Sequence, residues 1–212
     1  MMKPATRAWR PAAALLAGLT SLLSACGTAP PTRFHSLLPV PSPASARVMP
    51  VQTARAWDLM PVSLPAQVDT PQWVVRQADE TFVILEHDRW IAPLADEIRA
   101  AVALRLGAAD AAAPAGGTAV RRWQIAIEVR RLDAAIGRQV RLDAEWTLRA
   151  SDGQGGEGPR CQGQFEQAVG AGLDALGAGQ RSVFAQLGDA LAASLAPARH
   201  GAAPGCQGRP AP

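Results

Sequence analysis

Strict alternation of apolar and polar residues in two neighbouring stretches constrains the fold of this chain more than any other feature. From Trp123 to Val129, and again from Val140 to Leu148, every second residue is apolar and most residues between them are charged or polar. Successive side chains of a strand point to opposite faces, so this period of two predicts strands with one buried and one solvated face. Joined by a turn near 135–137, the two strands form an antiparallel hairpin.

Two amphipathic helices and several shorter strands are predicted around this hairpin. Apolar residues recur every three or four positions from Ile91 to Leu106, with Gly107 as the expected stop, and again from Leu173 to Leu195. Further strands are predicted at 34–38, 57–63, 72–77, 81–85 and 161–169. This order of elements favours a single α/β sandwich with a mixed, largely antiparallel sheet.

The N-terminus has the three parts of a bacterial export signal. Basic residues lie within the first ten positions, and residues 11–23 are mostly apolar but fewer than the roughly 20 that a transmembrane helix needs. The string Leu23-Ser24-Ala25-Cys26 then resembles the lipobox of bacterial lipoproteins. The resemblance implies cleavage between Ala25 and Cys26, which makes residues 1–25 a signal peptide, and acylation of Cys26. The alternative is an ordinary secretory signal with a chance cysteine.

Acylation would anchor the mature chain to a membrane. Each buried CH₂ group contributes about 0.8 kcal/mol, so two or more acyl chains give stable attachment. Gly27 follows the cysteine, whereas resemblance to sorted bacterial lipoproteins makes Asp at this position the signal for retention in the inner membrane. We therefore expect attachment to the outer membrane, with the body on its periplasmic face. Residues 26–50 are rich in proline and are expected to form an extended lipidated tether.

The charge of the chain changes when the signal is removed. The full chain has 21 basic and 18 acidic residues, but three of the basic ones, including the only lysine, lie in the first ten positions. The body is therefore balanced in charge. Affinity for nucleic acid comes largely from neutralising phosphates, so we expect no nucleic-acid partner.

Two further cysteines, Cys161 and Cys206, form an even pair in an oxidising compartment. A disulfide between them would close a loop of about 46 residues and, on the chain-entropy model, stabilise the fold by about 4 kcal/mol. We predict this bridge. Two free thiols or a metal-binding pair are the alternatives, although the metal pair lacks nearby ligands.

The sequence offers little for catalysis. Its three histidines are scattered, and the pair His87-Asp88 precedes a predicted helix, where Asp88 is expected to act as an N-cap. The pattern Gly170-x-Gly172-x-x-Ala175 lacks the following strand of a dinucleotide-binding unit. We therefore expect no catalytic residue, no metal site and no cofactor.

Five tryptophans remain after cleavage. Trp123 and Trp146 fall on the apolar faces of the hairpin and are expected to pack in the core. Trp57, Trp73 and Trp90 lie beside predicted turns or a helix start. For these three, core packing and an exposed anchor for a partner both stay open, with core packing favoured.

Several short strings resemble the PqiC/YmbA-type lipoproteins, the ABC-type transport auxiliary lipoprotein family. They are Pro61-Val62-Ser63-Leu64-Pro65-Ala66, Val68-Asp69-Thr70-Pro71-Gln72, Asp88-Arg89-Trp90, the strand from Val140 to Leu148, and the strand and helix from Cys161 to Leu195. None of these strings is catalytic. Their order behind a lipobox carries the resemblance, which spans nearly the whole mature chain.

The resemblance implies a three-layer α/β/α sandwich similar to anticodon-binding domains, here over residues 51–197, followed by a flexible tail at 198–212. It also implies a role beside an MCE-domain protein that spans the periplasm and its inner-membrane transporter, which together carry lipids between the membranes. The lipoprotein would be the docking piece at the outer membrane, and we leave a homo-oligomer open. The candidates for contact with the partner are Trp57, Pro61, Leu64, Pro65 and Trp73.

Two other classes of function compete with this hypothesis. One is a stand-alone lipoprotein of envelope maintenance that binds lipid or peptidoglycan itself, for which a large apolar cavity would be evidence. The other is a periplasmic enzyme, for which side chains converging around His87 would be evidence.

Overall fold

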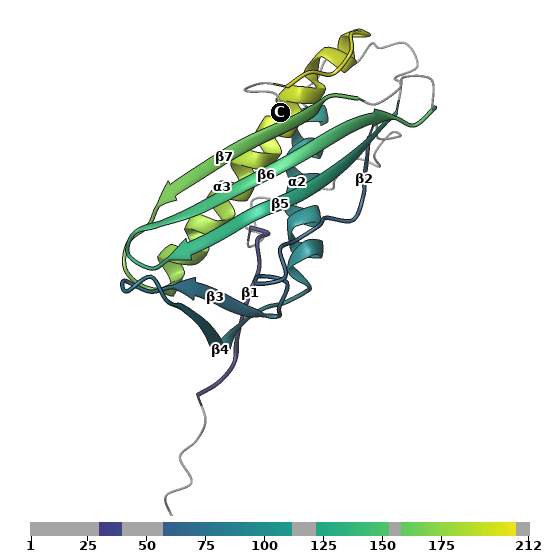
Figure 1. Ribbon diagram of the computed structural model, residues 1–212. Coiled ribbons are helices and arrows are strands. Elements are labelled where there is room, and N and C mark those ends of the chain that lie inside the picture. The colour runs from purple at the N-terminus through teal and green to yellow at the C-terminus, as the bar shows by residue number, and fades with distance from the viewer. Residues whose placement is uncertain (1–29, 40–56, 112–121, 153–157, 207–212) are drawn as a thin grey trace, which may run out of the picture. The chain divides into compact units, whose positions relative to one another are not determined.

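The computed structural model describes residues 30–39, 57–111, 122–152 and 158–206 (Figure 1). The chain divides into a unit of residues 1–31 and a unit of residues 32–212, and the fold below is that of the second. The predicted signal peptide, Ala25, Cys26 and most of the predicted tether lie outside the described residues.

Seven strands and two long helices make up the described unit (Figure 1). In chain order they are β1 (Arg33–His35), β2 (Trp57–Leu59), β3 (Gln72–Arg76), β4 (Phe82–Trp90), α2 (Leu94–Ala111), β5 (Trp123–Ala135), β6 (Gln139–Ala150), β7 (Arg160–Ala168) and α3 (Leu173–Leu195), with a final 3₁₀ turn at Ala196–His200. Each predicted strand has a counterpart, and the second helix has the predicted bounds. The sequence interpretation is therefore confirmed at the level of elements.

All seven strands belong to one mixed sheet in the order β1-β4-β3-β5-β6-β7, with β2 also paired to β5. The β5–β6 and β6–β7 pairs are long and antiparallel. The β3–β4 pair is shorter and is also antiparallel. The parallel pairs β1–β4, β2–β5 and β3–β5 are short. The predicted sheet, mixed and largely antiparallel, is confirmed.

The core lies between the sheet and the helices. Helix α3 packs against β5, β6 and β7 and also against α2, and both helices lie on the same face of the sheet (Figure 1). The largest fully buried side chains are Trp73, Trp146, Phe184, Leu94, Ile98, Leu106, Ile125, Leu142, Leu148, Leu176, Leu187 and Leu191. The α/β sandwich is thus confirmed; its described elements form one sheet layer and one helix layer (Figure 1), and the second helix layer that the resemblance implies is not found among the described residues.

Glycines let α3 approach its neighbours closely. A Cβ atom at Gly179 would lie 2.3 Å from Cγ1 of Val169, and one at Gly188 would lie 2.7 Å from Cβ of Arg105 on α2. At Gly177 it would lie 3.1 Å from the ring of Trp73. Side chains larger than hydrogen at the first two positions would push the helix away from the sheet or from α2.

Two local predictions were wrong. Gly107 does not end the first helix, which begins at Leu94 and continues to Ala111. A glycine inside a helix costs only about 1 kcal/mol, and the residues after it, Ala108, Ala109 and Ala111, are of the type that favours the helix most. Asp88 is not a helix cap either: it lies in β4, which extends to Trp90 because its last three residues pair with β1.

The end of the chain is held against the sheet. Cys161, at the start of β7, forms a disulfide with Cys206, and the amide of Gly205 donates to the carbonyl of Ser194 on α3. Residues 198–206 of the predicted flexible tail are therefore attached to the fold. None of the helices formed by the described residues is long and apolar enough to cross a membrane.

Candidate functional site

The folded unit begins at β1, the element nearest in sequence to the predicted lipid anchor. This three-residue strand lies at the edge of the sheet, parallel to the end of β4, with Arg33, Phe34 and His35 opposite Asp88, Arg89 and Trp90. The amide of Ile91 donates to the carbonyl of His35 at 2.9 Å. Three residues of strand give few backbone hydrogen bonds, so side chains must supply much of the attachment.

The buried carboxylate of Asp88 supplies much of the side-chain attachment of β1. Asp88 is only 5% exposed, and both of its oxygens accept hydrogen bonds from β1. The Arg33 guanidinium donates through Nε at 2.9 Å and Nη2 at 3.0 Å, and Nε2 of His35 donates at 2.8 Å. Burial raises the pKa of Asp88, but the hydrogen bonds from Arg33 and His35 outweigh it and hold that pKa below its ordinary value. Asp88 is therefore a charged residue whose burial is compensated from β1.

Aromatic stacking continues this contact into the core. The His35 ring lies on Trp73 of β3, with ring centroids 3.9 Å apart, and Trp73 contacts Trp90 of β4 with centroids 5.3 Å apart. The far edge of Trp73 then meets α3 at Gly177. The first strand is thus coupled to β3, β4 and α3 through one set of rings.

A second buried carboxylate holds the residues after β1. Glu97, in the first turn of α2, is 5% exposed. It accepts hydrogen bonds from the Ser36 hydroxyl at 2.6 Å and from the Leu37 amide at 2.8 Å. The Leu37 side chain is itself buried. Residues 33–37 are therefore fixed by two carboxylates from different elements, and we name this cluster the β1 attachment: Arg33, His35, Ser36, Asp88 and Glu97.

The predicted partner-contact residues fall in two places. Pro61, Leu64 and Pro65 belong to a segment that runs along the edge of β5: the amide of Ser63 donates to the carbonyl of Ile127 at 3.1 Å. Pro61 is exposed, and Leu64 and Pro65 are half-buried.

The two tryptophans proposed for the same contact lie inside the protein. Trp57, on β2 beside Trp123, is 3% exposed, and Trp73 is 1% exposed as part of the β1 attachment's aromatic stack. Core packing, the favoured alternative for both, is what the structure has. The exposed part of the predicted contact surface is therefore Pro61, with part of Leu64 and Pro65.

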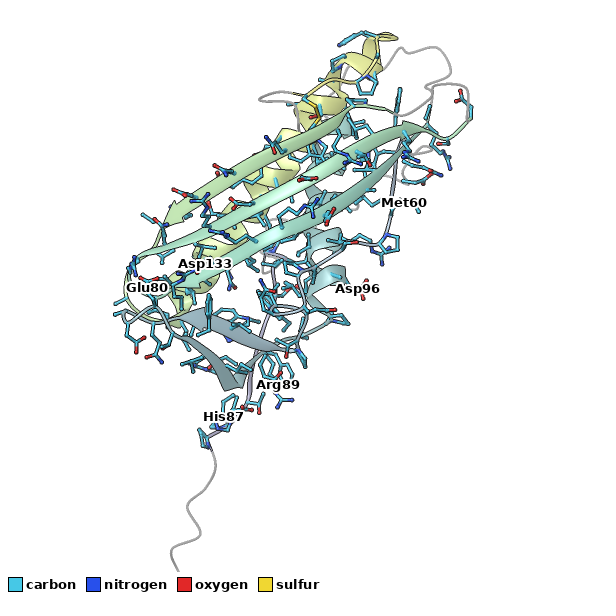
Figure 2. The ribbon with its side chains drawn as sticks, viewed as in Figure 1. Met60, Glu80, His87, Arg89, Asp96 and Asp133 are labelled. Atoms are coloured by element: carbon cyan, nitrogen blue, oxygen red, sulfur yellow. A yellow bond between two sulfur atoms is a disulfide. The ribbon has the colours of Figure 1, made fainter. Side chains whose placement is uncertain are left out.

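The side chains around His87 do not converge. His87 is exposed at the end of β4 that lies beside β1 (Figure 2), and its neighbour Asp88 bonds to His35. Within the described ranges, no group of three or more His, Cys, Asp or Glu side chains is placed to hold a metal ion.

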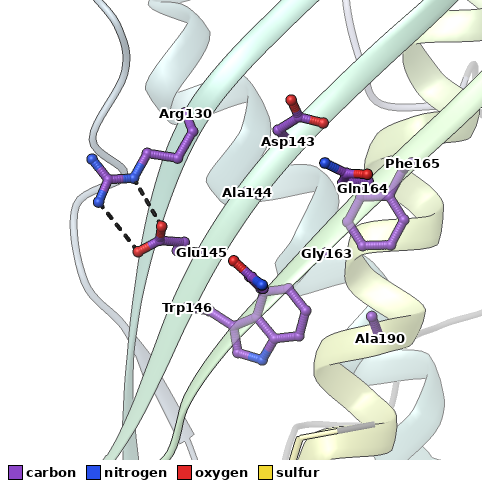
Figure 3. A pocket seen from close by; sticks show the side chains of 10 residues that line it. Arg130, Asp143, Ala144, Glu145, Trp146, Gly163, Gln164, Phe165 and Ala190 are labelled. Carbon is purple, nitrogen blue, oxygen red and sulfur yellow. Dashed lines mark hydrogen bonds and ion pairs between the residues drawn. The ribbon is translucent and has the colours of Figure 1, made fainter. Parts of the chain in front are cut away.

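One pocket lies over β6 and β7 (Figure 3), with a volume of about 550 Å³. Charged residues share its lining with aromatic ones: Arg130 pairs with Glu145 across one side, and Trp146 and Phe165 lie on the other. A lipid tail needs an apolar lining, because burying charges against hydrocarbon is costly. The pocket is therefore poorly suited to an acyl chain.

The outward face of β5, β6 and β7 is charged but balanced. Arg130 pairs with Glu128 and Glu145, and Arg141 pairs with Asp143 and Glu166. These pairs are exposed to solvent in varying degree and are each worth little for stability. Because basic and acidic side chains are paired in this way, the pairs give this face no large patch of a single charge.

Sequence reasoning missed the β1 attachment. Its two halves are more than fifty residues apart in the chain, and a three-residue strand has no periodicity to detect. The available signal was a matter of faces: Asp88 is two residues before Trp90, so a strand places both on one face, and Glu97 is three residues after Leu94, on the apolar side of the helix.

Comparison with known proteins identifies the fold and the family. The family model described as "ABC-type transport auxiliary lipoprotein component" matches residues 37–192. Among solved structures, protein XCC0632 from Xanthomonas campestris, described as a DUF330 protein, is similar with a TM-score of 0.56 and 15% identity over 68% of this chain and 85% of that one. An uncharacterized protein is similar with a TM-score of 0.54 and 17% identity, over 64% of this chain and 88% of that one. No curated protein matches the chain.

At these identities the two structures establish only a shared fold. The family match covers well over half of the chain, from the residue after Ser36 of the β1 attachment to the last turns of α3. The chain therefore belongs to the PqiC/YmbA-type family of lipoproteins that are auxiliary components of ABC-type transport.

Proposed function

We propose that this protein is a non-catalytic tethering subunit of an MCE-type system that moves lipids between the inner and outer membranes. In this proposal the acylated Cys26 holds it at the periplasmic face of the outer membrane. Its partner is an MCE-domain protein that spans the periplasm to an inner-membrane transporter. Family membership supports the auxiliary role in transport, and the lipobox string and Gly27 support the anchor and its location.

The observation that carries the proposal is the β1 attachment. It fixes the fold's first strand with two buried carboxylates at a point seven residues after Cys26. Seven residues span at most about 25 Å even when fully extended. An acylated Cys26 would therefore hold the domain close to the bilayer, and a pull on the anchor would be carried directly into the core.

Such confinement explains how a small surface could suffice for docking. Tethering one partner near the other raises their effective concentration and makes the second contact intramolecular. The segment of residues 61–65 exposes Pro61 and Ser63, and part of Leu64 and Pro65, rather than a large apolar surface. A modest interface of this kind is what a tethered adaptor requires.

Affinity isolation from solubilised envelopes tests the proposal. The full lipoprotein, carrying a tag at its C-terminus, should co-purify with an MCE-domain protein identified by mass spectrometry. A variant with Pro61→Glu, which places a charge on the exposed part of this segment, should reduce recovery, while Leu104→Gln at an exposed position of α2 should not.

The same purification tests the rival class of function. If no MCE-domain protein is recovered and phospholipid instead co-purifies in a fixed ratio with the protein, the chain binds lipid itself and the tethering proposal is wrong. The charged lining of the pocket at Arg130 and Glu145 supports tethering over lipid binding.

A further inference from the structure

Exposed apolar side chains gather at one end of the described structure. Eight large hydrophobic residues are exposed among the described residues, and five of them lie on β1, on β4 or within three residues of the end of one of these strands. These five are Phe34, Leu38, Phe82, Ile84 and Ile91. Phe34 and Ile91 are the most exposed, at 62% and 65%. Single exposed apolar residues need no explanation, but a group of this size does.

Strand register places Phe34, Phe82 and Ile84 on the face that points away from the core, and Ile91 directly follows β4. In β3, Trp73 and Val75 are buried, and Gln72, Val74 and Arg76 alternate with them on the opposite face. These three residues are paired with Arg89, Ile84 and Phe82 of β4, respectively. Phe34 is paired with Arg89 from the other side. We call this surface the β1–β4 face and define it by Phe34, Phe82, Ile84, Arg89 and Ile91.

Cations lie among these apolar residues. The Arg76 guanidinium lies 4.9 Å from the ring centroid of Phe82. Arg89 (Figure 2), half-buried on β4, is paired with Phe34 of β1. More than half of the Arg33 side chain is also exposed beside them. Aromatic and aliphatic side chains interspersed with arginine are typical of surfaces that lie in the headgroup region of a bilayer.

The length of chain before β1 indicates what covers this face. Only seven residues separate Cys26 from Phe34, so the Phe34 backbone would lie within about 30 Å of an acylated Cys26. We propose that the β1–β4 face rests on the bilayer that holds the acyl chains of Cys26, with Phe34, Ile84 and Ile91 in its headgroup region. This inference rests on the anchoring at Cys26 in the proposed function. It adds a defined orientation, with β1 and β4 toward the membrane.

Fluorescence quenching in vesicles tests the orientation. The full lipoprotein, purified from cells, is placed in vesicles of phosphatidylethanolamine and phosphatidylglycerol, with or without a phospholipid that carries a nitroxide near its headgroup. A thiol-reactive fluorophore is attached to Phe34→Cys, to Ile84→Cys or to the control Leu104→Cys. Leu104 is 44% exposed on α2, outside the β1–β4 face. We expect labels at 34 and 84 to lose most of their fluorescence and the label at 104 to keep it.

A second variant separates docking from insertion of the fluorophore itself. With Ile84→Gln and Ile91→Gln added, the label at 34 should regain fluorescence, because the neighbours that hold the face to the bilayer are gone. Equal quenching at 34 and 104, or quenching at 34 that persists in the double variant, would overturn the inference.

The mass of the N-terminal peptide, measured on the same samples, separates the two proposals. If Cys26 is acylated and the labels do not differ, the orientation alone is wrong. If Cys26 is unmodified, the anchor and the orientation both fail.

Discussion

Substituting Asp88 should test whether the β1 attachment holds the first strand in the fold. The Asp88→Ala change removes the acceptor for His35, whose side chain is only 18% exposed, and for Arg33, whose side chain is 56% exposed. A hydrogen bond to a charged group contributes about 1.5–3 kcal/mol, and a largely exposed ion pair contributes at most about 1 kcal/mol. The free energy of unfolding should therefore fall by about 2–4 kcal/mol.

The matched control is another bidentate Arg–Asp pair. Arg105 of α2 bonds to Asp189 of α3, with both side chains roughly half exposed. Because this pair is on the surface, Asp189→Ala should cost no more than about 1 kcal/mol. The two variants remove the same carboxylate and the same kind of Arg partner, and they differ in the burial of that carboxylate and in the additional hydrogen bond from His35.

Thermal unfolding of the purified protein with its disulfide intact gives the comparison. For a domain of this size, about 1 kcal/mol shifts the Tm by about 2–4 °C, so Asp88→Ala should lower it by about 5–15 °C and Asp189→Ala by less than about 4 °C. Equal shifts for the two variants would refute the reasoning that burial makes the Asp88 cluster strong.

The pH dependence of the stability difference between the parent protein and Asp88→Ala tests the direction of the pKa shift of Asp88. The pKa of Asp88 is lower in the folded protein than its ordinary value, because the donors from β1 outweigh burial. A depressed carboxylate pKa stabilises the fold above the unfolded value, near about 4, and that contribution is lost as the pH falls through the folded pKa. The stability difference between the parent protein and Asp88→Ala should therefore be full at pH 7 and shrink below about pH 4.

Three further predictions concern other parts of the chain. Cys26→Ala should leave a body that folds but no longer fractionates with membranes, because its acyl chains are lost; membrane fractionation by immunoblot measures this. Gly179→Ala should destabilise the fold by about 1–3 kcal/mol through overpacking against Val169, whereas Gly170→Ala, with no neighbouring atom closer than 3.9 Å, should not; urea unfolding compares them. Replacing Cys161 and Cys206 by serine should lower the free energy of unfolding by about 2–4 kcal/mol, and equal stability with and without reductant would contradict it.

The hairpin and α3 could be predicted because their patterns are local. Alternation from Trp123 to Val129 and heptad-like spacing from Leu173 to Leu195 depend only on which face of one element is buried. The sequence also predicted the pairing of Cys161 with Cys206 that the structure has, because these two cysteines remain once Cys26 is assigned to acylation.

The candidate site could not be predicted because it depends on contacts between distant residues. Asp88 is of a residue type that often caps helices, and it precedes the predicted helix. In the structure, residues 88–90 pair with β1, so β4 continues through Asp88 to Trp90. Trp73 lies beside a predicted turn, so the sequence left open whether it is buried or exposed. In the structure, His35 and Gly177 lie on either side of its ring. The β1–β4 face was missed for the same reason: Phe34 and Ile84 are fifty residues apart, and only strand pairing brings them to one surface.

The account depends most on where Cys26 is and what it carries. Separating the two membranes of the cell by density, and measuring the mass of this protein's N-terminal peptide in each fraction, tests both at once. We predict a peptide that begins at Cys26, carries acyl chains and is found in the outer-membrane fraction. A peptide with residue 26 unmodified, or an acylated peptide confined to the inner-membrane fraction, would contradict the account.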